Sequence, residues 1–256
     1  MPDTDFTALT EQWGMPMPAV QVAMARARYD LGRSVTSGRA VLEIGCGTGF
    51  GLDYLADTAR FVVGGDLSTA NLAQVRAHVP LAMVTCLDAH HLPFRAGAFD
   101  AVVVFEAIYY FADATAVLDE CRRLLAPDGV LVLSMPNPAH RGFHASPHSV
   151  RYFTASQLFD ALGDGAWTTE LWCGFPDEQS GWRSRALARV TGLANRLGLI
   201  PRDLRGRARL KRLVYGPLPP FAGLRHTSGP SQQLVPVTRT APTEGFRMLY
   251  ATARRA

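Results

Sequence analysis

The sequence predicts an α/β protein with a doubly wound, mostly parallel sheet of seven strands and a helical insertion before the last strand. Short apolar runs alternate with segments of helical length, which is the pattern of strand–helix–strand units. One run, 100–105, is apolar almost throughout, as in a strand that is buried on both faces. The 256 residues, with 48% hydrophobic and 19% charged side chains, are typical of an ordinary globular chain.

Residues 1–40 are expected to form a helical cap ahead of the sheet. The best helical segment is 19–29, which begins just after Pro18. Gly32 and Gly38 are expected to loosen the chain beyond it, because glycine is a poor helix former.

Residues 41–173 are expected to form the core, which holds the other strands except the last. Glycine and proline punctuate it: a glycine-rich turn leads from the first strand into a helix, and Pro127-Asp128-Gly129 ends a later helix. Ser68 is placed to cap the helix that follows it. In chain order the elements are the strand 40–44, a helix at about 50–58, the strand 61–64, the helix 69–78, the strands 81–87 and 100–105, the helix 113–125, the strand 130–134, the helix 154–162 and the strand 166–172.

Residues 174–245 are expected to be an insertion, and 246–256 to complete the core with a last strand at 246–253. The first half of the insertion has Leu187, Val190, Ala194 and Leu197 on one helical face, whereas the second half is rich in Pro and Gly and is expected to be loop. Residues 180–212 carry nine arginines and Lys211 against a single acid, Asp203. This stretch is interpreted first as a lid or dimer surface, then as a binding surface for an anionic substrate, and last as an RNA-binding surface.

Polar and glycine residues follow four of the predicted strands, where ligands of open α/β sheets bind. After the first strand come Glu43 and the alternating glycines Gly45, Gly47 and Gly49. Their GxGxG spacing differs from the dinucleotide fingerprint, and no GK[ST] phosphate loop is present. Asp66 follows the second strand and can accept both hydroxyls of a ribose. Asp88-Ala89 follow the third strand and can pair with an adenine edge, and Phe105-Glu106 follow the fourth. Together they describe a nucleoside with an amino-acid tail and no pyrophosphate.

Four blocks of the chain, in order, resemble the class I S-adenosylmethionine (SAM)-dependent methyltransferases, especially the small-molecule branch that includes ubiquinone and menaquinone biosynthesis enzymes. The blocks are VLEIGCGTG (41–49), VVGGDLS (62–68), CLDAHHLPFRAGAFDAVV (86–103) and ECRRLLAPDGVLVLS (120–134). The resemblance implies a Rossmann-like sheet whose last strand is antiparallel, SAM as cofactor and S-adenosylhomocysteine (SAH) as product. It implies Glu43 and the three glycines at the methionine end, Asp66 at the ribose, Asp88 and Ala89 at the adenine, and Leu67 and Phe105 packed nearby.

The residues that face the methyl acceptor are predicted from two further segments. Methyl transfer depends largely on alignment and desolvation, and a base is needed only where the acceptor must lose a proton. The loop 134–153 supplies His148 as the first catalytic candidate, because its surroundings resemble a pocket-lining segment of related enzymes, and Glu106 after the fourth strand is the second. The expected substrate-binding residues are Tyr109, Tyr110, His144, Arg151 and Tyr152.

The sequence therefore predicts an enzyme that moves the methyl group of SAM to an oxygen or nitrogen of a small molecule such as a sugar, a nucleotide-linked sugar or a secondary metabolite. The rival interpretation is an RNA-modifying methyltransferase or RNA-binding protein that uses residues 180–212. A third is a protein of this fold that has lost catalysis. No [DN]PP[YFW] motif follows the fourth strand, which argues against amino-methylation of bases.

The expected partners are a small-molecule substrate and, at most, a second copy of the chain; no nucleic acid, bound metal or membrane span is expected. Prolines and Gly142 break up the histidines of the loop 134–153, so they do not form a helical metal triad. No apolar run approaches the roughly 18 residues that span a bilayer. The N-terminus lacks a secretory pattern and the four cysteines form no CxxC pair, so reduced, buried thiols and a cytoplasmic location are expected.

Overall fold

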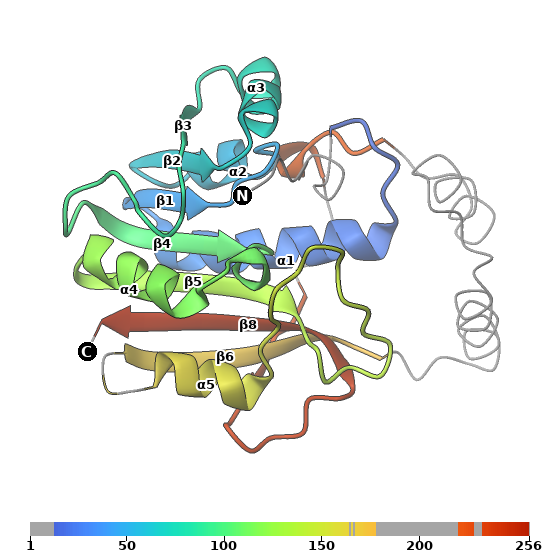
Figure 1. Cartoon of the computed structure of the whole chain (residues 1–256). Coiled ribbons are helices and arrows are strands. Elements are labelled where there is room, and N and C mark those ends of the chain that lie inside the picture. Colours follow the sequence, from blue (N-terminus) through green and yellow to red (C-terminus); the bar gives the residue numbers. More distant parts are fainter. Residues whose placement is uncertain (1–12, 164, 166, 178–219, 228–231, 256) are drawn as a thin grey trace.

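The structure is a computed structural model that describes residues 13–163, 165, 167–177, 220–227 and 232–255 (Figure 1). The predicted helical face at 187–197 and the basic stretch 180–212 lie outside these residues. Within the described part, eight strands form one mixed sheet in the order β3-β2-β1-β4-β5-β8-β6-β7. The strands are β1 (Ala40–Ile44), β2 (Phe61–Asp66), β3 (Met83–Cys86), β4 (Phe99–Phe105), β5 (Leu125–Pro136), β6 (Trp167–Pro176), β7 (Val235–Val237) and β8 (Phe246–Arg255).

The strand directions confirm an α/β sheet that is mostly parallel. β1 to β5 pair with one another in parallel, whereas β8 lies antiparallel between β5 and β6. The count of seven strands is wrong by one, because the short β7 adds to the outer edge of β6. β7 falls in the second half of the insertion, where Pro and Gly predicted only loop, and three residues are too short a run to stand out as a strand.

Helices cover both faces of the sheet (Figure 1). They are α1 (Ala19–Thr36), α2 (Leu52–Ala56), α3 (Thr69–His78), α4 (Ala114–Leu124) and α5 (Ala155–Leu162), with the short 3₁₀ helices η2 (Ile108–Tyr110) and η3 (Leu224–His226). The hydroxyl of Ser68 accepts from the backbone N–H of Asn71, as predicted for the cap of α3. Gly32 does not loosen α1, which continues to Thr36. A Cβ at position 32 would lie 3.1 Å from the Phe105 ring, so this glycine lets α1 approach β4 closely.

The predicted turn at Pro127-Asp128-Gly129 is an irregular start of β5. The strand already begins at Leu125, directly after α4, and its pairing with β4 shifts between Phe99 and Ala101. Asp128 has φ +62°, a left-handed conformation that bends the strand locally. Pro and Gly therefore mark a bulge at this point.

Alternate residues of the central strands point to opposite faces. Leu42 and Ile44 of β1 belong to the core under α4 and α5. Val41 belongs to the core under α1, α2 and α3, together with Ala101, its partner on β4. Glu43, two residues after Val41, therefore points toward α1. This alternation places a carboxylate inside the apolar layer between the sheet and α1.

Two distant segments of the chain meet over the glycine-rich turn that follows β1. The N–H of Gly14 donates to the carbonyl of Phe221, and the N–H of Phe221 donates to the carbonyl of Met15. The indole N–H of Trp13 reaches the carbonyl of Thr48 at 2.8 Å, and the N–H of Leu224 reaches that of Phe50 at 3.3 Å. We call residues 13–17 and 220–224 the clasp.

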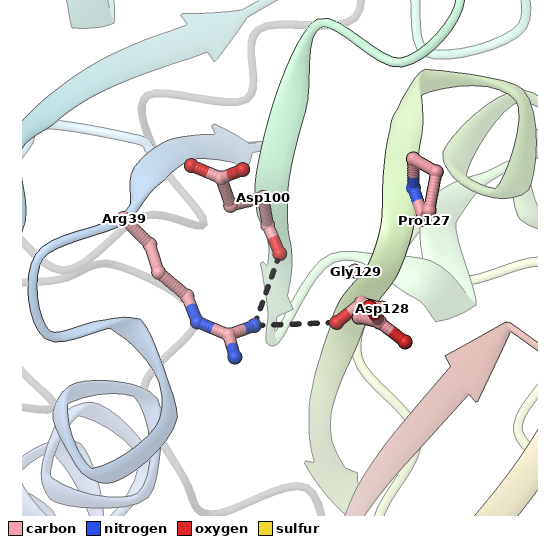
Figure 2. Close-up of a pocket in the computed structure, with 5 residues that line it drawn as sticks. All are labelled: Arg39, Asp100, Pro127, Asp128 and Gly129. Carbon is pink, nitrogen blue, oxygen red and sulfur yellow. Dashed lines mark hydrogen bonds between the residues drawn. The ribbon is translucent and has the colours of Figure 1, made fainter.

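The pocket in Figure 2 lies at the opposite end of the strands. It is lined by Arg39, Asp100, Pro127, Asp128 and Gly129, from the start of β1, β4 and β5. The guanidinium of Arg39 crosses it to the carbonyls of Asp100 and Asp128 at 3.4 and 3.5 Å. This pocket is therefore separate from the carboxyl ends of the strands.

Three of the four cysteines are buried as expected, while Cys86 at the end of β3 is exposed. All four are free thiols. No helix of the described part is long and apolar enough to cross a membrane.

Candidate active site

The site begins at the turn after β1, which is pinned to the end of β2. The N–H groups of Gly45 and Cys46 both donate to the carbonyl of Gly65, at 2.8 and 3.0 Å. Gly45, Gly47 and Gly49 have φ of +73°, +57° and +73°, so all three adopt the left-handed conformation that glycine favours. The predicted backbone turn is confirmed.

Gly45 is also required by packing within the protein. A Cβ there would lie 2.6 Å from the Cβ of Ala107, which follows β4. The turn therefore lies against the post-β4 segment, and this glycine serves close packing of the chain as well as any approach of a ligand.

Asp66 ties the turn to α3. Its Oδ2 accepts from the N–H of Gly47 at 2.8 Å, and its Oδ1 accepts from the N–H of Ser68 at 2.8 Å and the amide of Asn71 at 3.3 Å. Burial raises the pKa of Asp66, and the N–H groups of Ser68 and Gly47 oppose that rise. Because Oδ1 already accepts twice, Oδ2 has room for one further donor, so the carboxylate can take one ribose hydroxyl where the sequence suggested two.

Glu43 is the most buried acid of the site, with 1% of its surface exposed. The hydroxyl of Tyr29 donates to its Oε1 at 2.5 Å, while its Oε2 is buried without a hydrogen-bond partner among the described residues. Burial raises the pKa of Glu43 to about 7, against the lowering effects of the Tyr29 hydroxyl and the charge of Arg28. A buried, unsatisfied carboxylate oxygen is costly unless a donor reaches it, so a ligand cation fits this position.

Arg28 is a site residue that the sequence interpretation missed. It lies on α1, is 4% exposed, and its guanidinium stands 5.4 Å from the centre of the Phe50 ring, just after the glycine turn. Burial raises the pKa of both Glu43 and Tyr109, and the positive charge of Arg28 opposes that rise. The sequence does contain a signal for Arg28. Ala25, Arg28 and Gly32 share one helical face, and a charged residue on an otherwise apolar face is seldom buried unless it has a partner or a function.

The loop after β3 carries the predicted adenine contacts. Ala89 is buried, whereas Asp88 has a side chain that is 53% exposed. The backbone N–H of His90 and then its ring lower the pKa of Asp88. The side chain of Leu67, after β2, is 60% exposed. It offers an apolar surface beside these polar groups.

Phe105 ends β4 and Glu106 follows it, and the two side chains have different surroundings. The Phe105 ring packs edge-on against Tyr29, with ring centres 4.9 Å apart, so it lies under α1 behind Glu43. Glu106 has φ +55°, a rare conformation for a residue with a Cβ, and non-glycine residues are held there only by their surroundings. Its two carboxylate oxygens accept from the hydroxyls of Ser134 and Tyr109, each at 3.3 Å.

The three predicted tyrosines form one cluster beside Glu106. The Tyr109 ring lies 4.4 Å from that of Tyr152 in a stacked arrangement and 4.5 Å from that of Tyr110. The hydroxyls of Tyr110 and Ser146 lie 2.6 Å apart, and the N–H of Val150 donates to the carbonyl of Tyr109. The structure therefore brings the loop 134–153 against the segment after β4, as a substrate wall built from both would need.

The histidines of this loop are placed differently. His144 and His148 are exposed, and His148 has φ +67°. His140 uses both ring nitrogens: the N–H of Gly142 donates to Nδ1 at 3.1 Å, and Nε2 faces Asp177 at 2.8 Å. Arg151 is exposed and lies over the Phe153 ring at 4.9 Å. Of the predicted acceptor residues, Glu106, Tyr109, Tyr110 and Tyr152 lie together, whereas His144, His148 and Arg151 make no contact with that cluster through a side-chain hydrogen bond in the described part.

These residues fit the ligand that the resemblance implies. The unpartnered Oε2 of Glu43 suits an ammonium group, Arg28 suits a carboxylate, and Asp66 suits a ribose hydroxyl. Leu67 and Ala89 offer apolar contact to a purine whose amino group Asp88 can accept. In the described part no three His, Cys, Asp or Glu side chains gather as metal ligands.

Comparison with known proteins supports this interpretation. Residues 42–133 match the family described as "Methyltransferase domain". A probable S-adenosylmethionine-dependent methyltransferase of Mycolicibacterium smegmatis is 36% identical over 138 residues, 52% of this chain and 54% of that protein. A ubiquinone biosynthesis O-methyltransferase of Psychrobacter cryohalolentis is 36% identical over 108 residues, 40% of this chain and 42% of that protein. The chain thus spans about half the length of the curated relatives it matches.

Solved structures share the fold. The crystal structure of a SAM-dependent methyltransferase from Archaeoglobus fulgidus superposes with a TM-score of 0.59 over 91% of this chain and 94% of that one, at 16% identity. At this identity the likeness concerns the fold alone. Residues 42–133 of this chain are therefore similar to the methyltransferase domain of SAM-dependent methyltransferases, proteins whose cofactor is SAM.

Proposed function

We propose that this protein is an enzyme that transfers the methyl group of SAM to an oxygen or nitrogen of a small molecule. The observation that carries the proposal is the placement of Glu43, Asp66 and Asp88 at the carboxyl ends of β1, β2 and β3, three neighbouring strands. Their order across the sheet matches the order of groups along the ligand: amino-acid tail, ribose and adenine. SAM supplies an electrophilic methyl carbon and leaves as a neutral thioether.

The methionine end is assigned to Glu43 and Arg28. Glu43 presents Oε2 to the ammonium group, and Arg28, held on α1 beside the glycine turn, presents a guanidinium to the carboxylate. Tyr29 holds the other oxygen of Glu43, so the carboxylate has one orientation. Gly47 and Gly49 let the tail lie against the main chain of the turn.

The acceptor side is assigned to Glu106 and the cluster of Tyr109, Tyr110 and Tyr152. Glu106 is placed ahead of His148 as the group that takes a proton from the acceptor. Its carboxylate is held by two hydroxyls at the end of β4, beside the residue that packs on Gly45, whereas His148 stands in an exposed turn. The Tyr109 and Tyr152 rings supply flat apolar surface that would exclude water from the reacting groups.

A small-molecule acceptor is proposed from the chemistry of this wall. Stacked aromatic rings around one carboxylate suit an aromatic or otherwise flat acceptor that carries a hydroxyl or amino group. The name of the Psychrobacter relative, a ubiquinone biosynthesis O-methyltransferase, supports an oxygen acceptor.

Two measurements test the proposal. Calorimetry with SAH should show binding to the full chain, and an absence of heat at saturating ligand would contradict the cofactor assignment. Incubation with methyl-tritiated SAM and a fractionated cell extract should then place the label in the small-molecule fraction. Label that enters RNA, and is released by ribonuclease, would support the rival RNA-modifying activity instead.

A further inference from the structure

His90 connects two loops that follow different strands. It lies after β3, and Asp113, at the N-cap of α4, lies after β4. β3 and β4 are separated in the sheet by β2 and β1, so the post-β3 loop crosses the ends of two strands to reach this contact. The His90 ring also packs edge-on against Phe111, with ring centres 6.1 Å apart.

The contacts of His90 define which ring nitrogen carries the proton. The backbone N–H of Asp113 points at Nε2 at 3.2 Å. An amide N–H can only donate, so Nε2 must accept and carries no hydrogen. Nδ1 then carries the hydrogen and donates to Oδ1 of Asp88 at 2.7 Å. The ring is the neutral Nδ1–H tautomer, and it joins Asp88 to the start of α4.

This arrangement leaves one oxygen of Asp88 directed away from the protein's own donors. The backbone N–H of His90 also donates to Oδ1, at 2.9 Å. Two donors therefore converge on Oδ1, while Oδ2 has the ring nitrogen of His91 at 3.8 Å, beyond hydrogen-bond distance, among the described residues. The carboxylate cannot rotate without losing both bonds of Oδ1.

We propose that His90 is a positioning residue. Its Nδ1–H holds Asp88 so that Oδ2 of Asp88 accepts from the exocyclic amino group of the adenine. The site thereby prefers adenine to purines that lack this amino group. This inference rests on the proposed function, because it takes SAM or SAH as the ligand. Through Nε2, the same ring ties the adenine side of the site to the segment that carries Tyr109 and Tyr110.

Two substitutions separate the two bonds of the ring. In His90→Asn the amide nitrogen can take the place of Nδ1, so the bond to Asp88 is kept and the contact with Asp113 is lost. In His90→Gln the amide oxygen can take the place of Nε2, so the contact with Asp113 is kept and the bond to Asp88 is lost. His91→Ala is the matched control, because the neighbouring His91 has a side chain that is 87% exposed.

The measurement is calorimetric affinity for two ligands, SAH and its inosine analogue, in which oxygen replaces the adenine amino group. The full chain should prefer SAH by about 10-fold, the order of one hydrogen bond to a charged group. His90→Gln should lose most of this preference, while His90→Asn and His91→Ala should keep it. A general loosening of the loop would weaken both ligands equally and leave the ratio unchanged, and that result would overturn the inference.

The outcomes distinguish this inference from the function on which it rests. If the wild-type chain binds neither ligand, the proposed function fails and the inference fails with it. If the wild type binds SAH but does not discriminate against the inosine analogue, or if His90→Gln keeps the full ratio, only the inference fails.

A second measurement needs no variant. The nitrogen-15 shifts of the His90 ring in the labelled full chain should show a protonated Nδ1 and an unprotonated Nε2. A ring that is protonated at Nε2, or that exchanges between both tautomers, would contradict the contacts from which the inference starts.

Discussion

The hydroxyl of Tyr29 on α1 donates to Oε1 of Glu43 on β1 at 2.5 Å, and both side chains are buried. This bond joins the cap helix to the strand that leads into the glycine turn. It also leaves the second oxygen of Glu43 without a partner in the described part. The protonation of this one carboxyl group therefore affects both the stability of the fold and the binding of a cation.

The first prediction concerns the stability of the free protein. The folded pKa of Glu43, about 7, is above its ordinary value of 4.5, so between these values the folded chain binds more protons than the unfolded chain. The free energy of unfolding must then fall as the pH rises from about 4.5 to about 7, by an amount on the order of 3 kcal/mol from this group. Urea unfolding at several pH values should show this loss of stability. In Glu43→Gln, the part of the pH dependence that comes from this carboxyl group should be absent. Identical pH profiles for the two chains would contradict the prediction.

The second prediction concerns ligand binding. Glu43 must be ionised to bind an ammonium group, so SAH affinity should rise by about 10-fold between pH 6 and pH 8, where a group with a pKa near 7 loses its proton. Calorimetry at the two pH values measures this change. In Glu43→Gln the affinity should be lower and nearly independent of pH. A flat profile in the wild type would mean that Glu43 does not bind the ligand's cation.

The third prediction compares two glycines with the same backbone conformation. Gly45 and Gly38 have φ of +73° and +71°, but a Cβ at 45 meets Ala107 at 2.6 Å whereas a Cβ at 38 has nothing within 4 Å. Gly38→Ala should cost about 1 kcal/mol of strain, and Gly45→Ala about 2–4 kcal/mol because overpacking is added. Urea unfolding of both variants measures the difference. Equal losses would show that the turn can move away from Ala107.

The fourth prediction compares two aspartates that each accept a backbone N–H at 2.8 Å. Asp66 accepts from Gly47 at the proposed site, and Asp100 accepts from Ala40 at the other end of the strands. Both alanine variants should lower the free energy of unfolding by about 1–3 kcal/mol. Asp66→Ala alone should also weaken SAH binding, by a similar free energy, because a ribose hydroxyl loses its acceptor. Equal SAH affinity in the two variants would remove Asp66 from the site.

The core elements could be predicted because their signals are local. The helix 69–78 and the strand 40–44 have the predicted bounds, since Ser68 caps the one and a glycine turn ends the other. The start of β5 could not be placed from the sequence, because Pro127 and Gly129 are typical both of a turn and of a bulge. Only the pairing of β5 with β4 determines which of the two forms. The short strand β7 likewise forms only because the folded sheet offers the edge of β6 as a pairing partner.

The acids of the proposed methyl-donor side could be placed from the sequence, and the groups that it missed show where such reasoning stops. Glu43 and Asp66 lie in the last residues of β1 and β2, and Asp88 follows β3, so the strand order brings them to one edge. Arg28 and Tyr29 come from α1, the helix that precedes the sheet, and their place beside Glu43 depends on how α1 packs on the sheet, which no local motif shows. On the acceptor side, the resemblance of the segment around His148 to a pocket-lining segment favoured that residue. The backbone bond from Val150 to Tyr109 and the hydroxyls around Glu106 are tertiary contacts without a sequence motif.

The clasp has a consequence for the order in which the domain is made. Trp13 and Leu224 both bond to the carbonyls of the glycine turn, yet one is near the beginning of the chain and the other near its end. During synthesis β1, β2 and β4 can pair as soon as they emerge, whereas the turn receives its second cover only after residue 224 has left the ribosome. Contacts of such long sequence separation form slowly. We therefore expect the proposed methyl-donor site to be completed late, because a nascent chain that ends before residue 224 lacks the second cover of its glycine turn.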